Sequence, residues 1–194
     1  MICAGAVQTD NQAVANLSRH ISRFCQLFPH KRAIVFPAGR DDAGRVSYTH
    51  LTFAQLERDI QAFVRGFTAI GIKPGMKVVL MVRPSLEFLP LTYALFRLGA
   101  VPVLIDPGMG GKKLLHCIQQ VQPEAFIGIP LTHAIRTVFR KYFRSISIFV
   151  TIGARWFWGG YELDDIRKYD DSAVPNATTG PEDLAAVIFT TGST

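Results

Sequence analysis

The sequence is poor in cysteine and has no recognisable metal-binding motif. Cys3, Cys25 and Cys117 are odd in number and far apart, and no Cys-x-x-Cys pair occurs. A disulfide framework or a cysteine-based zinc site is therefore not expected, and a reducing, cytoplasmic compartment fits. The five histidines are equally dispersed and form no His-Glu-x-x-His motif, so we predict no metal site.

We also expect no targeting segment and no membrane-spanning segment. The first ten residues contain neither a basic region nor a long apolar run, which argues against a signal peptide. The one stretch of near-membrane length, residues 88–105, is interrupted by two prolines, an arginine and a glycine. It is better interpreted as a helix, a turn and a strand.

Acidic residues are fewer than basic ones, with 15 against 21, which gives a net charge of +6. This balance suits anionic ligands or an acidic membrane surface. The tight basic group Arg136, Arg140, Lys141 and Arg144 is spaced to lie on one helical face. We interpret it as a solvated face; the alternative is contact with phosphate or lipid headgroups, a peripheral membrane contact. No nucleic-acid-binding motif accompanies the charge, so we expect no nucleic-acid partner.

The first seventy residues predict two helices and a strand pair. Apolar residues at spacings of three and four predict an amphipathic helix over 13–28, and short strands follow at 33–36 and 46–49. Thr52 and Gln55 form a capping box for a helix whose apolar stripe continues to Ile70.

Beyond residue 74, apolar strands alternate with helices. The predicted strands are 77–82, 101–105, 125–129 and 146–151. The predicted helices are 85–99, capped by Ser85 and irregular at Pro90, then 112–121 and 131–143. This alternation predicts an α/β fold with a layered, mostly parallel sheet flanked by helices. Ligands of such sheets bind at the carboxyl ends of strands, where the loops Asp106–Gly111 and Thr190–Thr194 fall.

Two less regular segments precede the end of the chain. Both tryptophans lie in residues 156–160, which we interpret as a packed surface loop, with an apolar substrate wall as the alternative. A short helix is predicted over 163–169. Residues 170–181 are rich in Asp, Pro, Asn, Thr and Gly and are predicted to be an exposed linker.

The last eleven residues, 184–194, join a strand to a hydroxyl-rich loop. Ala185–Phe189 are all apolar and predict a short buried strand. The residues that follow are Thr190, Thr191, Gly192, Ser193 and Thr194. Their hydroxyl and backbone N–H groups can turn toward one anion, so we predict a phosphate-binding loop; an ordinary turn is the alternative. No Walker motif and no Gly-x-Gly-x-x-Gly motif occurs elsewhere in the chain.

Several ordered segments resemble the adenylate-forming synthetases and acyl-CoA ligases. They are Leu51-Thr52-Phe53-Ala54-Gln55-Leu56, Gly71-Ile72-Lys73-Pro74-Gly75-Met76-Lys77-Val78, Leu98–Val103, Asp106-Pro107-Gly108 and Leu184–Thr194. The resemblance implies that residues 1–194 are the N-terminal part of the AMP-binding domain, with the C-terminal domain absent. It also implies ATP and Mg²⁺ as cofactors, a carboxylate attack on the α-phosphate of ATP, and Thr190–Thr194 as the start of the ATP-phosphate loop.

In that family the loop lysine, the acidic Mg²⁺ residue and the ribose-binding aspartate come later in the chain. The resemblance therefore places them beyond Thr194, names no catalytic residue here, and implies that residues 1–194 alone are inactive. An interpretation of another class is a truncated fragment that serves as a binding module.

A narrower likeness points to the olefin β-lactone synthetase branch. It rests on Phe36–Arg40, Val82–Phe88, Ile105–Gly110 and Arg155–Gly160. Enzymes of that branch adenylate a long-chain β-hydroxy acid, and its hydroxyl then displaces AMP to close a β-lactone. The resemblance thus implies ATP and a fatty or β-hydroxy fatty acid as ligands; the alternative is a fatty acyl-CoA ligase.

Overall fold

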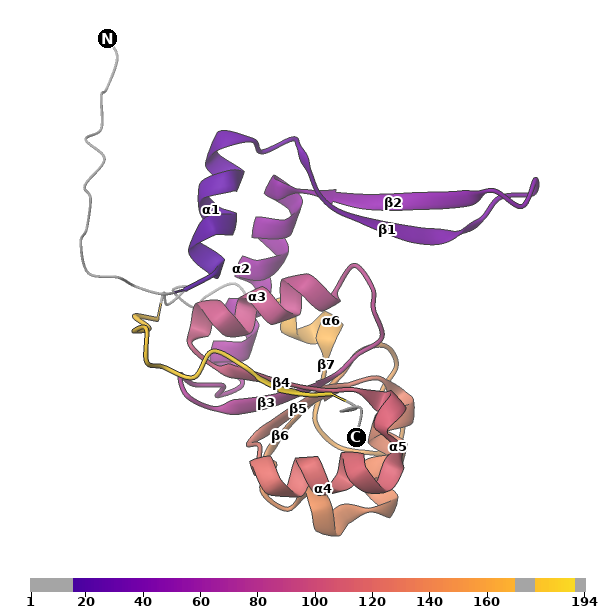
Figure 1. Cartoon of the computed structure of the whole chain (residues 1–194), viewed down its shortest axis with the longest axis vertical. Coiled ribbons are helices and arrows are strands. Elements are labelled where there is room, and N and C mark those ends of the chain that lie inside the picture. The colour runs from indigo at the N-terminus through magenta and orange to yellow at the C-terminus, as the bar shows by residue number, and fades with distance from the viewer. Residues whose placement is uncertain (1–15, 170–176, 191–194) are drawn as a thin grey trace.

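A computed structural model describes residues 16–169 and 177–190 of the chain (Figure 1). Its centre is a parallel sheet of six strands in the order β7-β6-β5-β3-β4-β8. The strands are β3 (Lys77–Met81), β4 (Val101–Ile105), β5 (Ala125–Gly128), β6 (Ile148–Thr151), β7 (Tyr161–Glu162) and β8 (Val187–Phe189). The predicted α/β fold with a parallel sheet is confirmed.

The three strands predicted to be buried neighbours lie side by side at the centre of the sheet. β3 pairs with β4 on one side, where Val79 opposes Val103, and with β5 on the other, where Val79 opposes Phe126. All three side chains are fully buried. Helices cover both faces of the sheet, which is why these strands read as unbroken apolar runs rather than alternating patterns.

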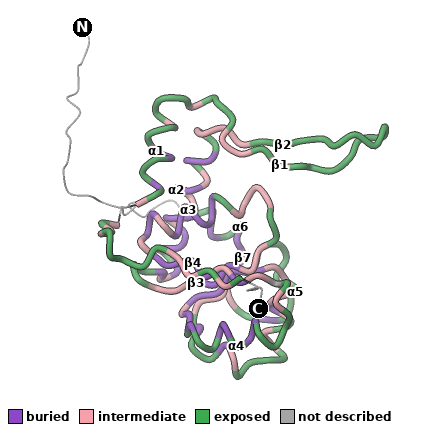
Figure 2. Tube along the Cα trace, viewed as in Figure 1, coloured by how far each residue is buried: buried purple, intermediate pink, exposed green. Residues whose placement is uncertain are grey.

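The helices form two layers (Figure 1). One layer comprises α1 (Ser18–Leu27), α2 (Phe53–Ala69), α3 (Phe88–Leu98) and α6 (Leu163–Ile166), and its core includes Phe63, Phe67 and Leu95. The other comprises α4 (Gly111–Val121), α5 (Pro130–Val138) and the 3₁₀ turns η1 (Pro107–Met109) and η2 (Arg140–Phe143). Most of the buried residues belong to the strands of the sheet and to the helices that pack on it (Figure 2). Among the described residues, no helix is long and apolar enough to cross a bilayer.

The capping box predicted for α2 is confirmed. The Thr52 hydroxyl accepts a hydrogen bond from the Gln55 N–H, and the Gln55 side chain accepts one from the Thr52 N–H at 2.8 Å. Toward its other end α2 packs closely on α6, because Gly66 leaves no side chain between them. A Cβ atom built there would lie 2.3 Å from the carbonyl oxygen of Ile166.

The start of α3 corrects the prediction that Ser85 caps it. The helix begins at Phe88 after Glu87, and no side chain caps its N-terminus. Pro90 is the third helical residue, where a missing N–H leaves no intrahelical bond unmade, so the predicted irregularity is absent. The end of the helix is as predicted: Gly99 adopts a left-handed conformation with φ of 69°.

The predicted helix 131–143 is two elements instead of one. α5 ends at Val138, and η2 follows as a tighter turn. The prediction that Arg136, Arg140, Lys141 and Arg144 lie on one helical face is therefore wrong, because only Arg136 belongs to α5. The guanidinium of Arg136 instead lies over the ring of Phe149, a contact that sequence spacing does not reveal.

The strand pair near the N-terminus is a longer hairpin than predicted. β1 (Arg32–Arg40) and β2 (Val46–Thr52) pair antiparallel with each other, and with no other strand of the described structure. The hairpin projects away from the layered body (Figure 1), and most of its residues are exposed (Figure 2). Only its base, including Ala33 and Ile34, packs on the core.

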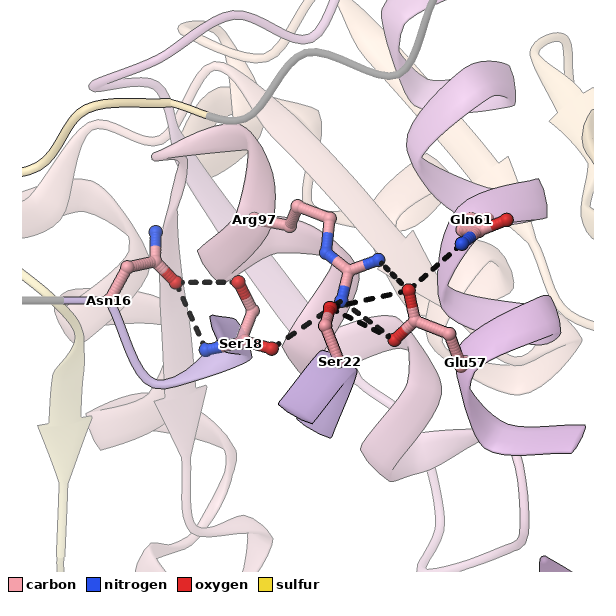
Figure 3. Close-up of polar contacts among 6 residues, drawn as sticks. All are labelled: Asn16, Ser18, Ser22, Glu57, Gln61 and Arg97. Atoms are coloured by element: carbon pink, nitrogen blue, oxygen red, sulfur yellow. Dashed lines mark hydrogen bonds and ion pairs between the residues drawn. The ribbon is translucent and has the colours of Figure 1, made fainter. Parts of the chain in front are cut away.

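A buried polar network joins α1, α2 and α3 (Figure 3). Arg97 of α3 forms an ion pair with Glu57 of α2, and its guanidinium also donates to the Ser22 hydroxyl of α1 at 2.9 Å. Gln61 donates to the same carboxylate at 2.9 Å. The network supplies partners for polar groups that a helix layer would otherwise bury at a high cost in free energy.

Candidate functional site

The loops that follow β4 and β8 lie side by side at the carboxyl edge of the sheet. Ile105 and Phe189 are opposite each other in the parallel register of these strands. The backbone N–H of Asp106 donates to the carbonyl oxygen of Phe189 at 3.1 Å. The prediction that both loops fall at this edge is confirmed for Asp106 and Thr190, the first residue of each loop.

The Asp106 loop is a tight turn from strand to helix. A side-chain oxygen of Asp106 accepts a hydrogen bond from the Gly108 N–H at 2.8 Å. The backbone carbonyl oxygen of Asp106 accepts one from the Met109 N–H at 3.2 Å. Gly110 has a φ of 83°, which a residue with a side chain rarely adopts, and α4 starts immediately afterwards. The turn therefore brings the N-terminus of α4 to the carboxyl edge.

The electrostatics of this edge favour an anion. The first turn of α4 has no acidic residue, and it carries Lys112 and Lys113, both exposed. The unsatisfied N–H groups of a helix N-terminus add a partial positive charge. Arg83, also exposed, follows the end of β3 at the same edge. Phosphate oxygens entering here would meet these cations and backbone N–H groups, next to the carboxylate of Asp106, which accepts a hydrogen bond from Gly108.

The predicted phosphate loop is described only at its first residue. Thr190 is exposed directly after β8. Thr191, Gly192, Ser193 and Thr194 lie outside the described residues, so their role stays a prediction. The strand before them corrects the expectation for Ala185–Phe189: only Val187–Phe189 form a strand, and Ile188 is 64% exposed. β8 is an edge strand, and in the described structure no layer covers the face that carries Ile188.

The tryptophan-rich segment is anchored by one of its aromatic residues. Trp158 is buried, and its Nε1–H donates to the Thr151 hydroxyl at 3.0 Å, whereas Trp156 and Phe157 are exposed. Gly160 has a φ of 112°, and a Cβ atom there would lie 2.5 Å from the carbonyl oxygen of Phe149. Residues 156–160 therefore form a packed surface loop, as predicted.

His133 is a buried titratable residue that the sequence did not single out. Its ring stacks on Trp158 with centroids 5.6 Å apart, and its Nε2–H donates to the Val150 carbonyl at 3.0 Å. Burial lowers the pKa of His133 to about 4, with a smaller contribution from the Arg136 charge. The imidazole is therefore neutral at pH 7 and holds α5 against β6.

Comparison with known proteins gives a family match over most of the chain. Residues 21–194 match the family model of the AMP-binding enzyme. The chain is 39% identical over 183 residues to the olefin beta-lactone synthetase of Xanthomonas campestris pv. campestris, and 42% identical over 183 residues to that of Stenotrophomonas maltophilia. These alignments cover 93% and 92% of this chain but 33% of each relative. The chain thus spans about a third of the length of these curated relatives.

Solved structures share the fold. A long-chain-fatty-acid-CoA ligase from Archaeoglobus fulgidus matches with a TM-score of 0.74 and 20% identity, over 92% of this chain and 35% of that protein. An anthranilate CoA ligase in complex with anthranoyl-AMP matches with a TM-score of 0.77 and 18% identity, over 92% of this chain and 33% of that protein. At these identities the likeness shows the fold alone.

Proposed function

The chain belongs to the family of AMP-binding enzymes, and on that premise we propose that its protein activates a long-chain or β-hydroxy fatty acid with ATP. The acid carboxylate attacks the α-phosphate of ATP, which gives an acyl-adenylate and releases pyrophosphate. The β-hydroxyl then attacks the acyl carbonyl and displaces AMP, which closes a β-lactone. The observation that carries this proposal is the 39% and 42% identity to two olefin beta-lactone synthetases over nearly the whole chain.

The first step joins two anions, so the leaving pyrophosphate has to be held and neutralised. The carboxyl edge described above supports this role, because Thr190 leaves the sheet next to Asp106, whose turn leads to the N-terminus of α4 and its two lysines. In the proposal, Thr190, Thr191, Gly192, Ser193 and Thr194 bind the phosphates through hydroxyl and backbone donors.

Mg²⁺ would accompany the ATP phosphates and neutralise their charge. Within residues 16–169 and 177–190, no group of three His, Cys, Asp or Glu side chains could hold a metal ion. We therefore assign no residue of this chain to Mg²⁺ and derive no step through it.

The same proposal divides the chain by role. Residues 1–194 are the N-terminal part of an AMP-binding domain, and 184–194 contribute a strand and the start of the phosphate loop. Residues 170–181 are the linker before them; of these, 170–176 lie outside the described residues. The remaining catalytic groups would come from a C-terminal part of the enzyme, so residues 1–194 alone should not adenylate an acid.

The test uses the complete gene product that contains residues 1–194. It is incubated with ATP, Mg²⁺ and a long-chain 3-hydroxy acid, with and without coenzyme A, and AMP, pyrophosphate and lactone are measured. We expect AMP, pyrophosphate and lactone without coenzyme A. The unsubstituted acid of the same length is the matched control, because it can be adenylated but has no hydroxyl to close the ring.

Other outcomes identify the alternatives. Product that forms only when coenzyme A is added would make the protein an acyl-CoA ligase. Absence of substrate-dependent ATP–pyrophosphate exchange in the complete protein would remove the enzymatic proposal and favour a binding module. Exchange by residues 1–194 alone would contradict the assignment of the missing catalytic groups.

A further inference from the structure

A long stretch of the chain contains cations but no carboxylate. Between Glu124 and Glu162 there is no Asp or Glu, whereas the stretch includes four arginines and one lysine. Its formal charge is therefore +5, close to the +6 of the whole chain. The stretch forms β5, α5, η2, β6 and the tryptophan-rich loop. Its cations therefore belong to the half of the sheet that contains β5 and β6 and to the helices and loop connected to these strands.

Arg136 within this stretch is partly buried, and no carboxylate of the described residues pairs with it. Its guanidinium carbon lies 3.7 Å from the ring centre of Phe149, and its Nε atom is buried with no hydrogen-bond partner. Burial lowers the pKa of Arg136, and the neighbouring Arg140 lowers it further. The ring of Phe149 stabilises this guanidinium in part, and a bound anion would offset the remaining cost of burying it beside a second cation.

Both arginines open onto one cavity, which we call the Arg136 pocket. It has a volume of about 310 Å³, and its walls include Phe149, Phe157 and Trp158. Two guanidinium groups at one pocket suit a phosphate group, which accepts several hydrogen bonds in the planar geometry that arginine offers.

The outer face of α5 is apolar instead of polar. Leu131 and Val138 are 59% and 76% exposed, and Ile135 lies between them on the same helical face. Phe157, at the wall of the Arg136 pocket, is 77% exposed. An ordinary surface helix turns such a stripe toward the core, so this face is suited to an apolar medium.

An apolar groove lies next to the Arg136 pocket and shares one lining residue with it. It has a volume of about 490 Å³ and lies between α4 and α5, with Leu114, Leu115 and Phe139 in its lining. Phe143 lines both cavities. A cationic pocket next to an apolar groove matches a molecule with a phosphate at one end and a hydrocarbon chain at the other.

We propose that α5, η2 and residues 156–159 form a docking face for a membrane surface that contains anionic phospholipid. Arg136 and Arg140 bind a headgroup phosphate, Val138 and Phe157 enter the interfacial region, and the groove receives part of an acyl chain. Charge complementarity selects anionic lipid, and exposed aromatic and aliphatic side chains favour a lipid surface over a free phosphate ion. This inference does not depend on the reaction proposed above.

The test uses the complete protein. Its binding to phosphatidylcholine vesicles with and without phosphatidylglycerol is measured by co-sedimentation. We expect binding only to the anionic vesicles. The double variant Arg136→Gln/Arg140→Gln should lower the partition coefficient roughly thirtyfold, given the attraction that each cation near an anionic surface provides. Val138→Ser/Phe157→Ser, which keeps every charge, should also weaken binding. The matched control is Arg19→Gln/Arg23→Gln on α1, which removes the same charge from exposed positions elsewhere.

Circular dichroism of each variant checks that the fold is kept, and titration with inorganic phosphate tests the other source of the ligand. An equal loss of binding in the α1 control would show nonspecific attraction and overturn the proposal. So would failure of the protein to bind anionic vesicles, or unchanged binding by the Val138→Ser/Phe157→Ser variant. Arginine-dependent binding of free phosphate without vesicle binding would assign the pocket to a soluble anion instead.

Discussion

The guanidinium of Arg97 donates to both carboxylate oxygens of Glu57, at 2.7 and 2.9 Å, although these residues lie on different helices (Figure 3). Both side chains are largely buried. Burial raises the pKa of Glu57, but the hydrogen bonds from Arg97 and Gln61 outweigh it and hold the pKa below its usual value. The pair therefore fixes how α2 and α3 pack, and it does so in the charged form.

Replacing Arg97 with Met should destabilise the protein by about 3–5 kcal/mol at pH 7, because it leaves a buried carboxylate without its cation. Urea denaturation measures the change. The loss should shrink as the pH falls through the folded-state pKa of Glu57, since a depressed pKa stabilises the fold only while the carboxylate is ionised. Lys168→Met, which removes an exposed ion pair with Asp165, is the control and should have no measurable effect. An equal urea midpoint for the Arg97 variant and the parent would contradict the prediction.

Gly66→Ala should destabilise the protein by roughly 1–3 kcal/mol, although alanine favours helix formation. The added methyl group would meet the backbone of Ile166 in α6, which cannot move aside as a flexible side chain does. Gly111→Ala in the first turn of α4 is the matched control, because nothing lies within 4 Å of its Cβ position. Thermal unfolding of the two variants should differ; equal melting temperatures would show that α6 adjusts without cost.

His133 should make stability depend on pH between about 6.5 and 4. Its folded-state pKa of about 4 lies below the unfolded value, so the unfolded chain binds a proton more readily over this window. Stability is full above pH 6.5 and falls by on the order of 2–3 kcal/mol toward pH 4. The free energy of unfolding, measured by urea denaturation at several pH values in this range, should change less with pH for His133→Gln than for the parent. His116→Gln, at an exposed position of α4, should leave the profile unchanged; the same slope in all three proteins would exclude His133 as the source.

Thr191→Ala should lower ATP-dependent turnover of the complete protein roughly tenfold, because the variant lacks the hydroxyl that we propose donates to a charged phosphate. Steady-state kinetics with ATP as the varied substrate measure it. Thr178→Ala, an equivalent change at an exposed residue outside the loop, is the control. Unchanged ATP kinetics in the Thr191 variant would remove this residue from the phosphate site.

The sheet was predictable because its signals are local. The apolar runs of β3, β4 and β5 and the capping box at Thr52 each lie within a few residues of sequence, and the structure confirms them. The parallel topology then placed Asp106 beside the end of β8, which the hydrogen bond from Asp106 to Phe189 confirms.

What could not be predicted depends on contacts distant in the sequence. Arg97 gave a signal, as a charge inside an apolar helix, but periodicity does not identify Glu57, forty residues earlier, as its partner. The end of α5 was missed because its helical spacing continues into η2 in sequence. His133 is one of five dispersed histidines, and nothing in the neighbouring sequence distinguishes it from the others. Its burial follows from packing against Trp158.

The projecting hairpin has a consequence for how the molecule exchanges its amide protons with solvent. Among the strands that the structure describes, β1 and β2 pair only with each other, whereas β3 pairs with a strand on each side within the core. Opening a two-stranded ribbon in water costs little free energy, so its amides should take up deuterium early. The amides of β3 should exchange only when the whole domain unfolds. Chemical labelling or proteolysis should likewise reach residues 36–47 first and leave the layered body intact.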